Sequence, residues 1–173
     1  PLIFPCMLRV GARGQHRSES RVPGEDTTTM HYSYSCYRPR PGVAVPPQPV
    51  IPVYEVPWRH SDGNFIVDFV DGGDIMTWVT QGPIADRTRE LLVKSDKGLV
   101  MLRQLLNEQV DRVTRGLDPL GVVRDPATNA LIEFAQEHDK LGDGRSFLRE
   151  SIAMSHVRYS PIRDQIIELL ERD

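Results

Sequence analysis

Hydrophobic and polar residues alternate along the first 38 residues of the chain. Residues 2–10, 15–22 and 27–38 are short runs rich in β-branched and aromatic side chains, separated by the turn-forming stretches GARG and PGED. Alternation in the third run separates two faces, one with Met30, Tyr32, Tyr34 and Cys36 and the other with Thr29, His31, Ser33 and Ser35. The pattern predicts an antiparallel meander, one face of which is wet or lines a cavity.

The period of the pattern becomes helical in the second half of the chain. From Ser95 to Arg115 the apolar residues recur at spacings of three and four, at Leu99, Leu102, Leu106, Val110 and Val113. This spacing predicts a long amphipathic helix that Gly116 and Pro119 end. A weaker helical pattern covers 130–141, and the tail, 142–173, combines an irregular GDGRSF stretch with a last helix from Ser160 to Glu171. The apolar side of that last helix is formed by Ile162, Ile166, Leu169 and Leu170.

Turn-forming residues mark the connection between the two halves. Seven of the fourteen prolines lie between Pro39 and Pro57, which predicts an extended connector that runs over the surface at 39–57. The stretch HSDGNFIVDFVDGGD contains two Asp-Gly pairs that favour turns, and DIMTWVTQG predicts a short helix or an irregular turn. Strands first and helices later indicate one α+β domain over 1–173, a curved antiparallel sheet packed on one long helix.

Composition excludes several classes of function. The 21 Lys and Arg residues against 24 Asp and Glu give a net charge of −3 with no basic stripe, which argues against a nucleic-acid partner. No apolar run has the length of a membrane span, and the opening PLIF is too short for a signal peptide, so we expect a cytoplasmic protein. Cys6 and Cys36 encode neither a disulfide framework nor a zinc site. Because the chain opens without Met on a strand-like stretch, we expect it to be a piece of a longer polypeptide.

One carboxylate stands at the beginning of the long predicted helix. Asp96 precedes Leu99 by three residues and Leu102 by six, so its side chain is expected on the buried side. An ionised carboxylate there requires helix-terminal N–H groups, a basic side chain or a metal cation. Position alone favours a simple helix N-cap by Ser95 or Asp96.

The residues around Asp96 add a resemblance to this picture. The stretch QGPIADRTRELLVKSDKG, with RVPGEDTTT and FIVDFVDGGDIMTWVT before it and GLDPLGVVRDP after it, resembles the catalytic C-terminal region of Rieske non-haem iron oxygenase α subunits of the phthalate-dioxygenase type. The matching positions are Gln81, Gly82, Ile84, Asp86, Arg87, Thr88, Glu90, Ser95, Asp96 and Gly98. The resemblance implies a helix-grip fold of the START and Bet v 1 type, present here in part. It also implies a mononuclear Fe(II) held by two histidines and one aspartate, and Asp96 corresponds to that aspartate.

The resemblance further implies an enzyme that hydroxylates or O-demethylates aromatic compounds with O2. Electrons would come from NAD(P)H through a reductase or ferredoxin and a [2Fe-2S] Rieske cluster in an N-terminal domain, and α subunits would assemble as a homo-oligomer. The family's Cys-x-His and Cys-x-x-His pairs and its two-histidine motif are not found in this sequence. We therefore expect this chain by itself to supply one iron ligand of three and to be inactive.

Other residues near Asp96 have more than one interpretation. Gln81 is a candidate for hydrogen-bond support of the iron ligands, and Leu92 and Val93 are candidates for the substrate pocket, although apolar packing is their ordinary role. The charged residues at 86–90 have two interpretations. They form an ordinary surface ion-pair network, or they brace the long helix or contact a neighbouring subunit. His138 is interpreted as part of a solvated helix face and His156 as a residue of the tail, and neither is expected to bind a metal.

Two alternatives to the oxygenase hypothesis remain at this point. The chain could be a non-enzymatic helix-grip module that binds an aromatic ligand without metal, or an inactive truncated remnant with an exposed sheet edge. Hydrolase and nucleotide-binding functions lack support, because the sequence contains no Gly-x-Ser-x-Gly elbow and no phosphate-binding loop.

Overall fold

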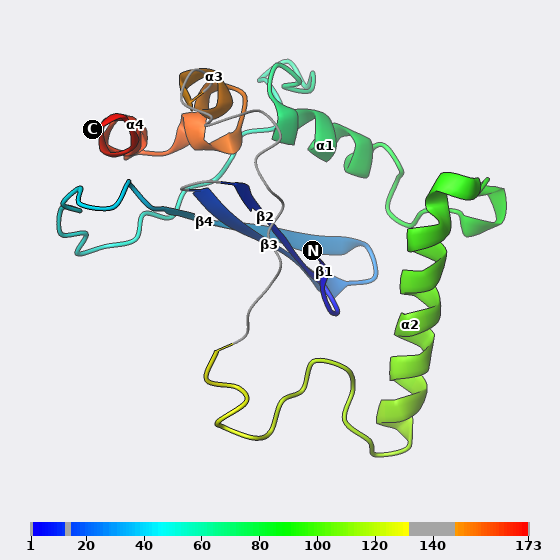
Figure 1. Ribbon diagram of the computed structural model, residues 1–173. Coiled ribbons are helices and arrows are strands. Elements are labelled where there is room, and N and C mark those ends of the chain that lie inside the picture. The colour runs from blue at the N-terminus through cyan, green and yellow to red at the C-terminus, as the bar shows by residue number, and fades with distance from the viewer. Residues whose placement is uncertain (1, 13–14, 132–147, 173) are drawn as a thin grey trace.

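A computed structural model describes residues 2–12, 15–131 and 148–172 (Figure 1). Its four-stranded antiparallel sheet has the order β1-β2-β3-β4, with β1 at Leu2–Ile3, β2 at Met7–Ala12, β3 at Gln15–Glu25 and β4 at Thr28–Tyr37. The longest hairpin joins β3 and β4 and has an irregularity between Pro23 and Glu25. The predicted antiparallel meander is therefore confirmed, except that the first predicted run, 2–10, is divided into β1 and β2 by a turn at 4–6.

Helices and short 3₁₀ turns follow the sheet. They are α1 at Val70–Val79, η1 at Arg87–Arg89, η2 at Lys94–Asp96, α2 at Lys97–Thr114, α3 at Leu148–Ala153, η4 at His156–Tyr159 and α4 at Arg163–Glu171. The long helix and the last helix agree with the hydrophobic periods, whereas α3 and η4 were not predicted. Residues 38–57, which follow β4, contain no helix or strand and are largely exposed.

The two Asp-Gly pairs behave differently. Asp62-Gly63 forms the predicted turn, in which the His60 N–H donates to the Asn64 carbonyl at 2.8 Å and Gly63 has a φ of +87°. The predicted turn at Asp71-Gly72 is wrong, because both residues lie in the first turn of α1. A carboxylate is favourable in this position, close to the unpaired N–H groups of the helix.

The hydrophobic core lies at one end of the sheet, under the C-terminal helices. Ile152, Val157 and Ile166 are buried together, and Tyr37 from the end of β4 packs against them with Ile162, Ile167 and Leu170. Phe69, immediately before α1, is 2% exposed and makes an edge contact with the ring of Tyr159. The Val70 N–H donates to the Met154 carbonyl at 2.9 Å. The start of α1 and the tail of the chain are thus joined.

The two faces of the sheet have different surroundings. The face with His31, Ser33 and Ser35 is partly covered by α1 and η4, and the His31 ring meets the edge of Trp78 in α1 at 5.0 Å between centroids. The opposite face, with Met30, Tyr32 and Tyr34, is exposed. One face is wet, as expected, but it is the apolar and aromatic one.

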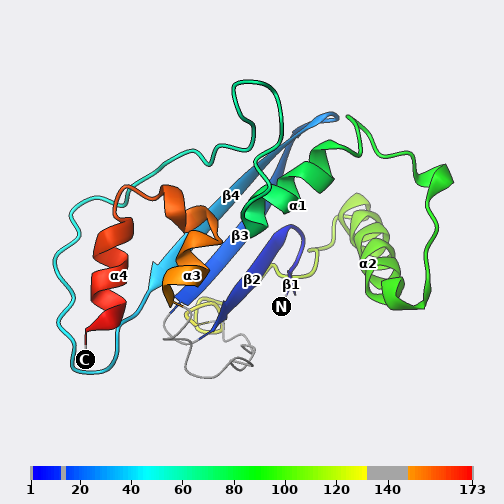
Figure 2. The same cartoon turned by 90° about the horizontal axis from the view of Figure 1, so that it is seen from above.

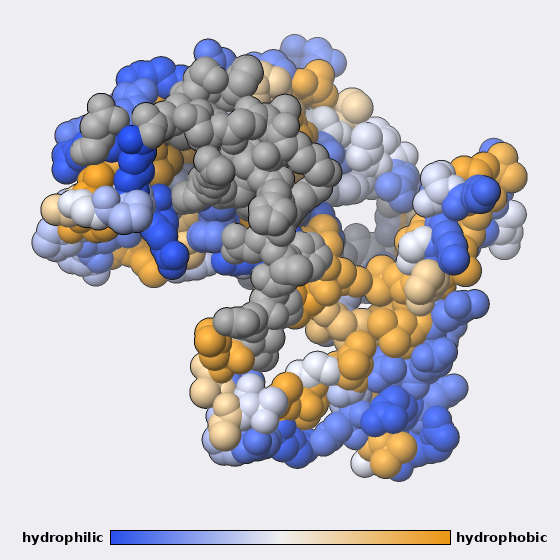
Figure 3. Space-filling model, in the orientation of Figure 1, coloured by the Kyte–Doolittle hydropathy of each residue, from blue (hydrophilic) through white to orange (hydrophobic). Residues whose placement is uncertain are grey.

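Helix α2 lies to one side of the sheet, and its main neighbour is η2, the turn before it (Figures 1 and 2). Its predicted apolar stripe is largely accessible, with Val110 at 63% and Val113 at 55% exposure, so the expectation that the stripe is buried is wrong. Hydrophobic surface is visible along the side of α2 that faces the sheet (Figure 3). The α+β class is confirmed, but the sheet does not grip α2 in this structure. Most of the predicted helical stretch at 130–141, together with the GDGRSF stretch and His138, lies outside the residues that the structure describes.

Candidate functional site

The segment between α1 and α2 folds as two short turns. Gly82, with a φ of +83°, turns the chain after α1. Asp86 caps η1, because its Oδ1 atom accepts hydrogen bonds from the Thr88 N–H at 3.0 Å and from the Thr88 hydroxyl at 2.7 Å. η2 follows and leads directly into α2. The segment is therefore held by local hydrogen bonds and brings Asp96 to the start of α2.

Asp96 closes the η2 turn. Its Oδ2 atom accepts a hydrogen bond from the Val93 N–H at 2.8 Å, and its own N–H donates to the Val93 carbonyl at 2.9 Å. The side chain is half-buried rather than enclosed in the core. Within the described ranges, the second carboxylate oxygen has no hydrogen-bond partner. Asp96 occupies the N-cap position of α2, but its side chain does not cap the N–H groups of that helix. One carboxylate oxygen closes the preceding η2 turn instead, and the other remains available to a cation.

The other predicted site residues lie in different places. The Gln81 side-chain amide donates to the Thr77 carbonyl at 3.2 Å, at the C-terminal end of α1. Leu92 and Val93 are neighbours of Asp96 in the chain, with exposures of 39% and 58%. Val93 thus meets Asp96 through its backbone N–H and carbonyl, whereas the Gln81 amide is bound at the end of α1.

The charge cluster at 86–90 holds this segment against α2. Glu90 receives two hydrogen bonds from the Arg103 guanidinium in α2, at 2.5 and 2.7 Å, and a third from Arg87 at 3.1 Å. The Arg103 hydrogen bonds lower the pKa of Glu90 from 4.5 to about 2. Of the interpretations considered, the brace for the long helix is therefore the one this geometry supports.

Replacing Glu90 by glutamine is expected to loosen the segment that carries Asp96. Because the pKa of Glu90 is lower in the folded protein than its ordinary 4.5, its contribution is complete above pH 4.5 and is lost as the pH falls toward 2. Amide hydrogen exchange of residues 86–96 should be faster in Glu90→Gln at pH 6, and the difference from the wild type should shrink near pH 3. Glu108→Gln, an exposed change on α2, is the matched control and should leave this exchange unchanged.

A buried polar cluster, which the sequence did not predict, joins three parts of the fold. Asp71 in α1 pairs through Oδ1 with the Arg17 guanidinium of β3, and its Oδ2 atom accepts a hydrogen bond from the His156 N–H at 2.7 Å. Arg17 Nε also donates to Ser33 Oγ at 2.8 Å and lies 2.9 Å from Glu19. Burial by itself would raise the pKa of Asp71, but the His156 and Arg17 interactions outweigh it and hold the pKa well below 3.8.

The connectivity of Ser35, His156 and Asp71 is that of a hydrolase triad, but the geometry does not support this function. His156 Nε2 lies 3.4 Å from Ser35 Oγ, and Nδ1 lies 3.4 Å from Asp71 Oδ2. Both distances are long, and His156 is 4% exposed, so a substrate does not reach it. The cluster is a structural junction. The signal in the sequence was Asp71 directly after the apolar run FIVDFV, which is typical of a helix start.

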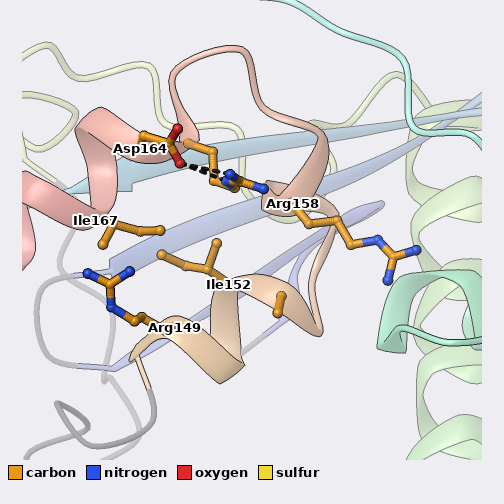
Figure 4. Close-up of a pocket in the computed structure, with 7 residues that line it drawn as sticks. Arg149, Ile152, Arg158, Asp164 and Ile167 are labelled. Carbon is orange, nitrogen blue, oxygen red and sulfur yellow. Dashed lines mark hydrogen bonds and ion pairs between the residues drawn. The ribbon is translucent and has the colours of Figure 1, made fainter.

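A shallow cavity of about 390 Å³ lies between α3, η4 and α4 (Figure 4). Its lining comprises Arg149, Ile152, Ala153, Arg158, Arg163, Asp164 and Ile167. Each of its arginines is already paired, Arg149 with Glu171, Arg158 with Asp68 and Arg163 with Asp164. These pairs leave no unmatched arginine charge for an anionic ligand.

A mononuclear iron would find one suitable ligand in this part of the chain. Asp96 offers one carboxylate oxygen that is oriented by the Val93 N–H and another that is unused. Across residues 2–12, 15–131 and 148–172, no group of three or more His, Cys, Asp or Glu side chains is arranged to hold a metal ion. Asp96 is therefore suited to be one carboxylate ligand of an iron site whose other ligands would come from outside these ranges. In the same ranges, no helix combines the length and apolar character of a membrane span.

Comparison with known proteins defines the class of this chain. A family model described as "LigXa C-terminal domain like" matches residues 60–160, and the chain belongs to this family. Its class is therefore the C-terminal region of a Rieske-type oxygenase. The chain is also 36% identical over 120 residues to the 5,5'-dehydrodivanillate O-demethylase oxygenase subunit of Sphingobium sp. (strain NBRC 103272 / SYK-6). That alignment covers 69% of this chain and 28% of the relative. No solved structure matches the chain.

Proposed function

We propose that this chain is part of the oxygenase subunit of a Rieske-type enzyme that hydroxylates or O-demethylates aromatic compounds, and that Asp96 is the carboxylate ligand of its iron. The family match over residues 60–160, which include Asp96, is the observation that carries the proposal. The relative's name describes an O-demethylase, which makes an aromatic methyl ether one substrate class to test. The unused carboxylate oxygen of Asp96 adds a structural reason.

Several residues of the chain would prepare Asp96 for this role. The Val93 N–H fixes one carboxylate oxygen, so the direction of the other is restricted before a cation binds. Glu90 and Arg103 hold the preceding segment on α2 and limit its movement. Leu92 and Val93 present apolar surface beside the carboxylate, where an aromatic ring could pack. Gln81 would support the iron ligands only after a change of its present hydrogen bond to Thr77.

The whole enzyme would require groups that lie outside this chain. Bound Fe(II) would supply the centre at which O2 is reduced, and two histidines of the longer subunit would complete its ligands. A [2Fe-2S] Rieske cluster, a reductase or ferredoxin fed by NAD(P)H, and a homo-oligomer of α subunits belong to the same proposal. In the longer subunit, a helix-grip arrangement would cover the apolar stripe of α2.

Replacement of Asp96 by asparagine in the full-length oxygenase subunit tests the proposal. Asparagine keeps an oxygen that accepts from the Val93 N–H and is as good a helix cap as aspartate, but it lacks the charge that binds a cation. We expect mononuclear iron content, measured by metal analysis with correction for the cluster iron, to fall at least tenfold and turnover to be lost. The thermal midpoint should change little.

Asp111→Asn, on the exposed side of the same helix, is the matched control and should retain both iron and turnover. If Asp96→Asn retained full iron and activity, Asp96 would be a cap and nothing more. Binding of an aromatic ligand with equal affinity in the presence and absence of iron would instead favour a ligand-binding module.

A further inference from the structure

Helix α1 lies over the β3–β4 hairpin and is tied to it by side chains at both of its ends (Figures 1 and 2). In the first turn, Asp71 pairs with Arg17 of β3. In the last turn, the Arg21 guanidinium lies over the indole of Trp78, with 5.1 Å between Cζ and the ring centroid. The His31 ring stands nearly perpendicular to the same indole at 5.0 Å between centroids. The second attachment, made by Trp78, Arg21 and His31, is named here the tryptophan clamp.

The spacing of the two attachments explains why α1 follows β3. Arg17 and Arg21 are four residues apart in the strand, so both side chains leave the same face at a separation of about 13 Å. Asp71 and Trp78 are seven residues apart, which places them on one side of the helix at a separation of about 10 Å. His31 is the cross-strand partner of Arg21 and therefore projects from the same face. The helix is thus fixed to the sheet at two matching points.

Glu19 holds the two strand residues of the clamp in place. Its Oε2 atom lies 3.2 Å from Arg21 Nη2 and 3.8 Å from His31 Nε2. Its other carboxylate oxygen lies 2.9 Å from Arg17 Nε. The Glu19 side chain is only 12% exposed, so solvent ions screen these contacts less than they screen a surface ion pair. One carboxylate therefore links both attachments of α1.

The clamp lies at the end of α1 from which the Asp96 segment, residues 80–96, departs. The Gly82 N–H donates to the Val79 carbonyl at 3.2 Å, which joins the first residues of the segment to the helical turn that carries Trp78. At its other end the segment reaches α2, where Asp96 closes η2. The main neighbour of α2 among the described residues is η2 itself, and the sheet does not grip this helix. The attachment of the segment to the sheet therefore runs through the end of α1.

We propose that Trp78 is a positioning residue for Asp96: by fixing the end of α1 on the sheet, the tryptophan clamp restricts where the carboxylate lies and raises the affinity of the subunit for iron. This proposal rests on the proposed function, in which Asp96 is an iron ligand. Trp78 touches neither iron nor substrate in this role. A ligand that is held in place before the metal binds loses less conformational freedom on binding, so the affinity is higher.

Substitutions of Trp78 in the full-length oxygenase subunit test the positioning role. Trp78→Leu removes the aromatic ring and should raise the dissociation constant for Fe(II) roughly tenfold, measured by anaerobic titration after removal of the mononuclear iron. Trp78→Phe keeps an aromatic face for Arg21 and His31, so its dissociation constant should stay within about threefold of the wild type. Trp58→Leu is the matched control and should leave the affinity unchanged. The Trp58 ring also lies beside an arginine, Arg59 at 4.7 Å, but it precedes α1 and does not hold the Asp96 segment.

Hydrogen exchange provides a readout that does not use iron. In the subunit without mononuclear iron, the amides of residues 84–96 should exchange roughly threefold faster or more in Trp78→Leu than in the wild type. Faster exchange confined to α1, with the segment and the Fe(II) affinity unchanged, would make Trp78 a packing residue only and overturn the proposal.

Arg21→Met carries the test if Trp78→Leu does not fold. Methionine keeps an apolar stem on the sheet but removes the guanidinium over the indole. The Fe(II) affinity should then fall by about two- to fivefold, the factor that corresponds to an exposed cation–π contact. Unchanged affinity in Arg21→Met would overturn the proposal.

The Asp96→Asn variant separates this proposal from the proposed function. If Asp96→Asn loses iron while the Trp78 and Arg21 variants bind it as the wild type does, only the positioning role fails. If Asp96→Asn itself retains iron, the proposed function fails, and the positioning role fails with it.

Discussion

Replacing Asp71 by asparagine is expected to destabilise the fold by about 3–5 kcal/mol, the usual effect of removing one partner from a buried ion pair. Arg17 would lose its carboxylate partner in α1, and the amide that replaces one oxygen would direct a donor at either Arg17 or the His156 N–H. Since Asp71 joins β3, α1 and η4, the loss should appear as a lower urea midpoint and as faster hydrogen exchange throughout α1. Asp74→Asn, on the exposed side of the same helix, should change stability by less than about 0.5 kcal/mol.

The Asp71 effect should depend on pH in one direction. Because the pKa of Asp71 is depressed in the folded protein, its contribution is complete above its ordinary value of 3.8 and is lost as the pH falls below it. The difference in unfolding free energy between the wild type and Asp71→Asn should therefore be constant from pH 5 to 7 and should shrink below pH 4. A difference that grows in acid would show that the ionised carboxylate does not stabilise the junction.

Replacing Gly72 by alanine is expected to prevent α1 from docking in its present position. An added Cβ atom would lie 2.0 Å from the Ile66 carbonyl oxygen and 2.5 Å from the Phe69 ring. Backbone atoms cannot move away as a flexible side chain can, so the cost should exceed the roughly 1–3 kcal/mol typical of overpacking. Helix propensity has the opposite sign, since alanine is favoured over glycine by about 1 kcal/mol inside a helix.

The neighbouring glycine provides the control for this prediction. Gly73 lies in the same helix, and an added Cβ would meet no atom within 4 Å. Gly73→Ala should therefore stabilise the protein by about 0.5–1 kcal/mol. Unfolding curves of the two single variants, compared with the wild type, measure both effects. Equal and favourable shifts would show that α1 does not pack against Ile66 and Phe69 as described.

Local patterns predicted the secondary structure well. Alternation in residues 27–37 and the three- and four-residue spacing after Ser95 depend on backbone geometry, so they identified β4 and α2 without tertiary information. The same rules failed at Asp71-Gly72, where a turn-forming pair was placed inside a helix by its buried neighbours. They also could not predict what α2 packs against, because an apolar stripe indicates a surface that favours burial but does not identify the element that covers it.

The candidate site was predicted only in part. The resemblance around Gln81 to Gly98 pointed to the family that the comparisons then confirmed, and it singled out Asp96 at the start of α2. Its role as an iron ligand stays a prediction. The hydrogen bond from Gln81 to Thr77 and the two hydrogen bonds from Arg103 to Glu90 became visible only in three dimensions.

The sequence by itself determined the antiparallel strands at the start of the chain, the long helix and the last helix, and the position of Asp96 before an amphipathic helix. The tertiary structure decided which sheet face is covered and which side chains meet. Arg17 and Asp71 are 54 residues apart, and Asp71 and His156 are 85 apart. No local pattern encodes such a pairing, because the free energy that favours it arises only after three separate segments exclude water together.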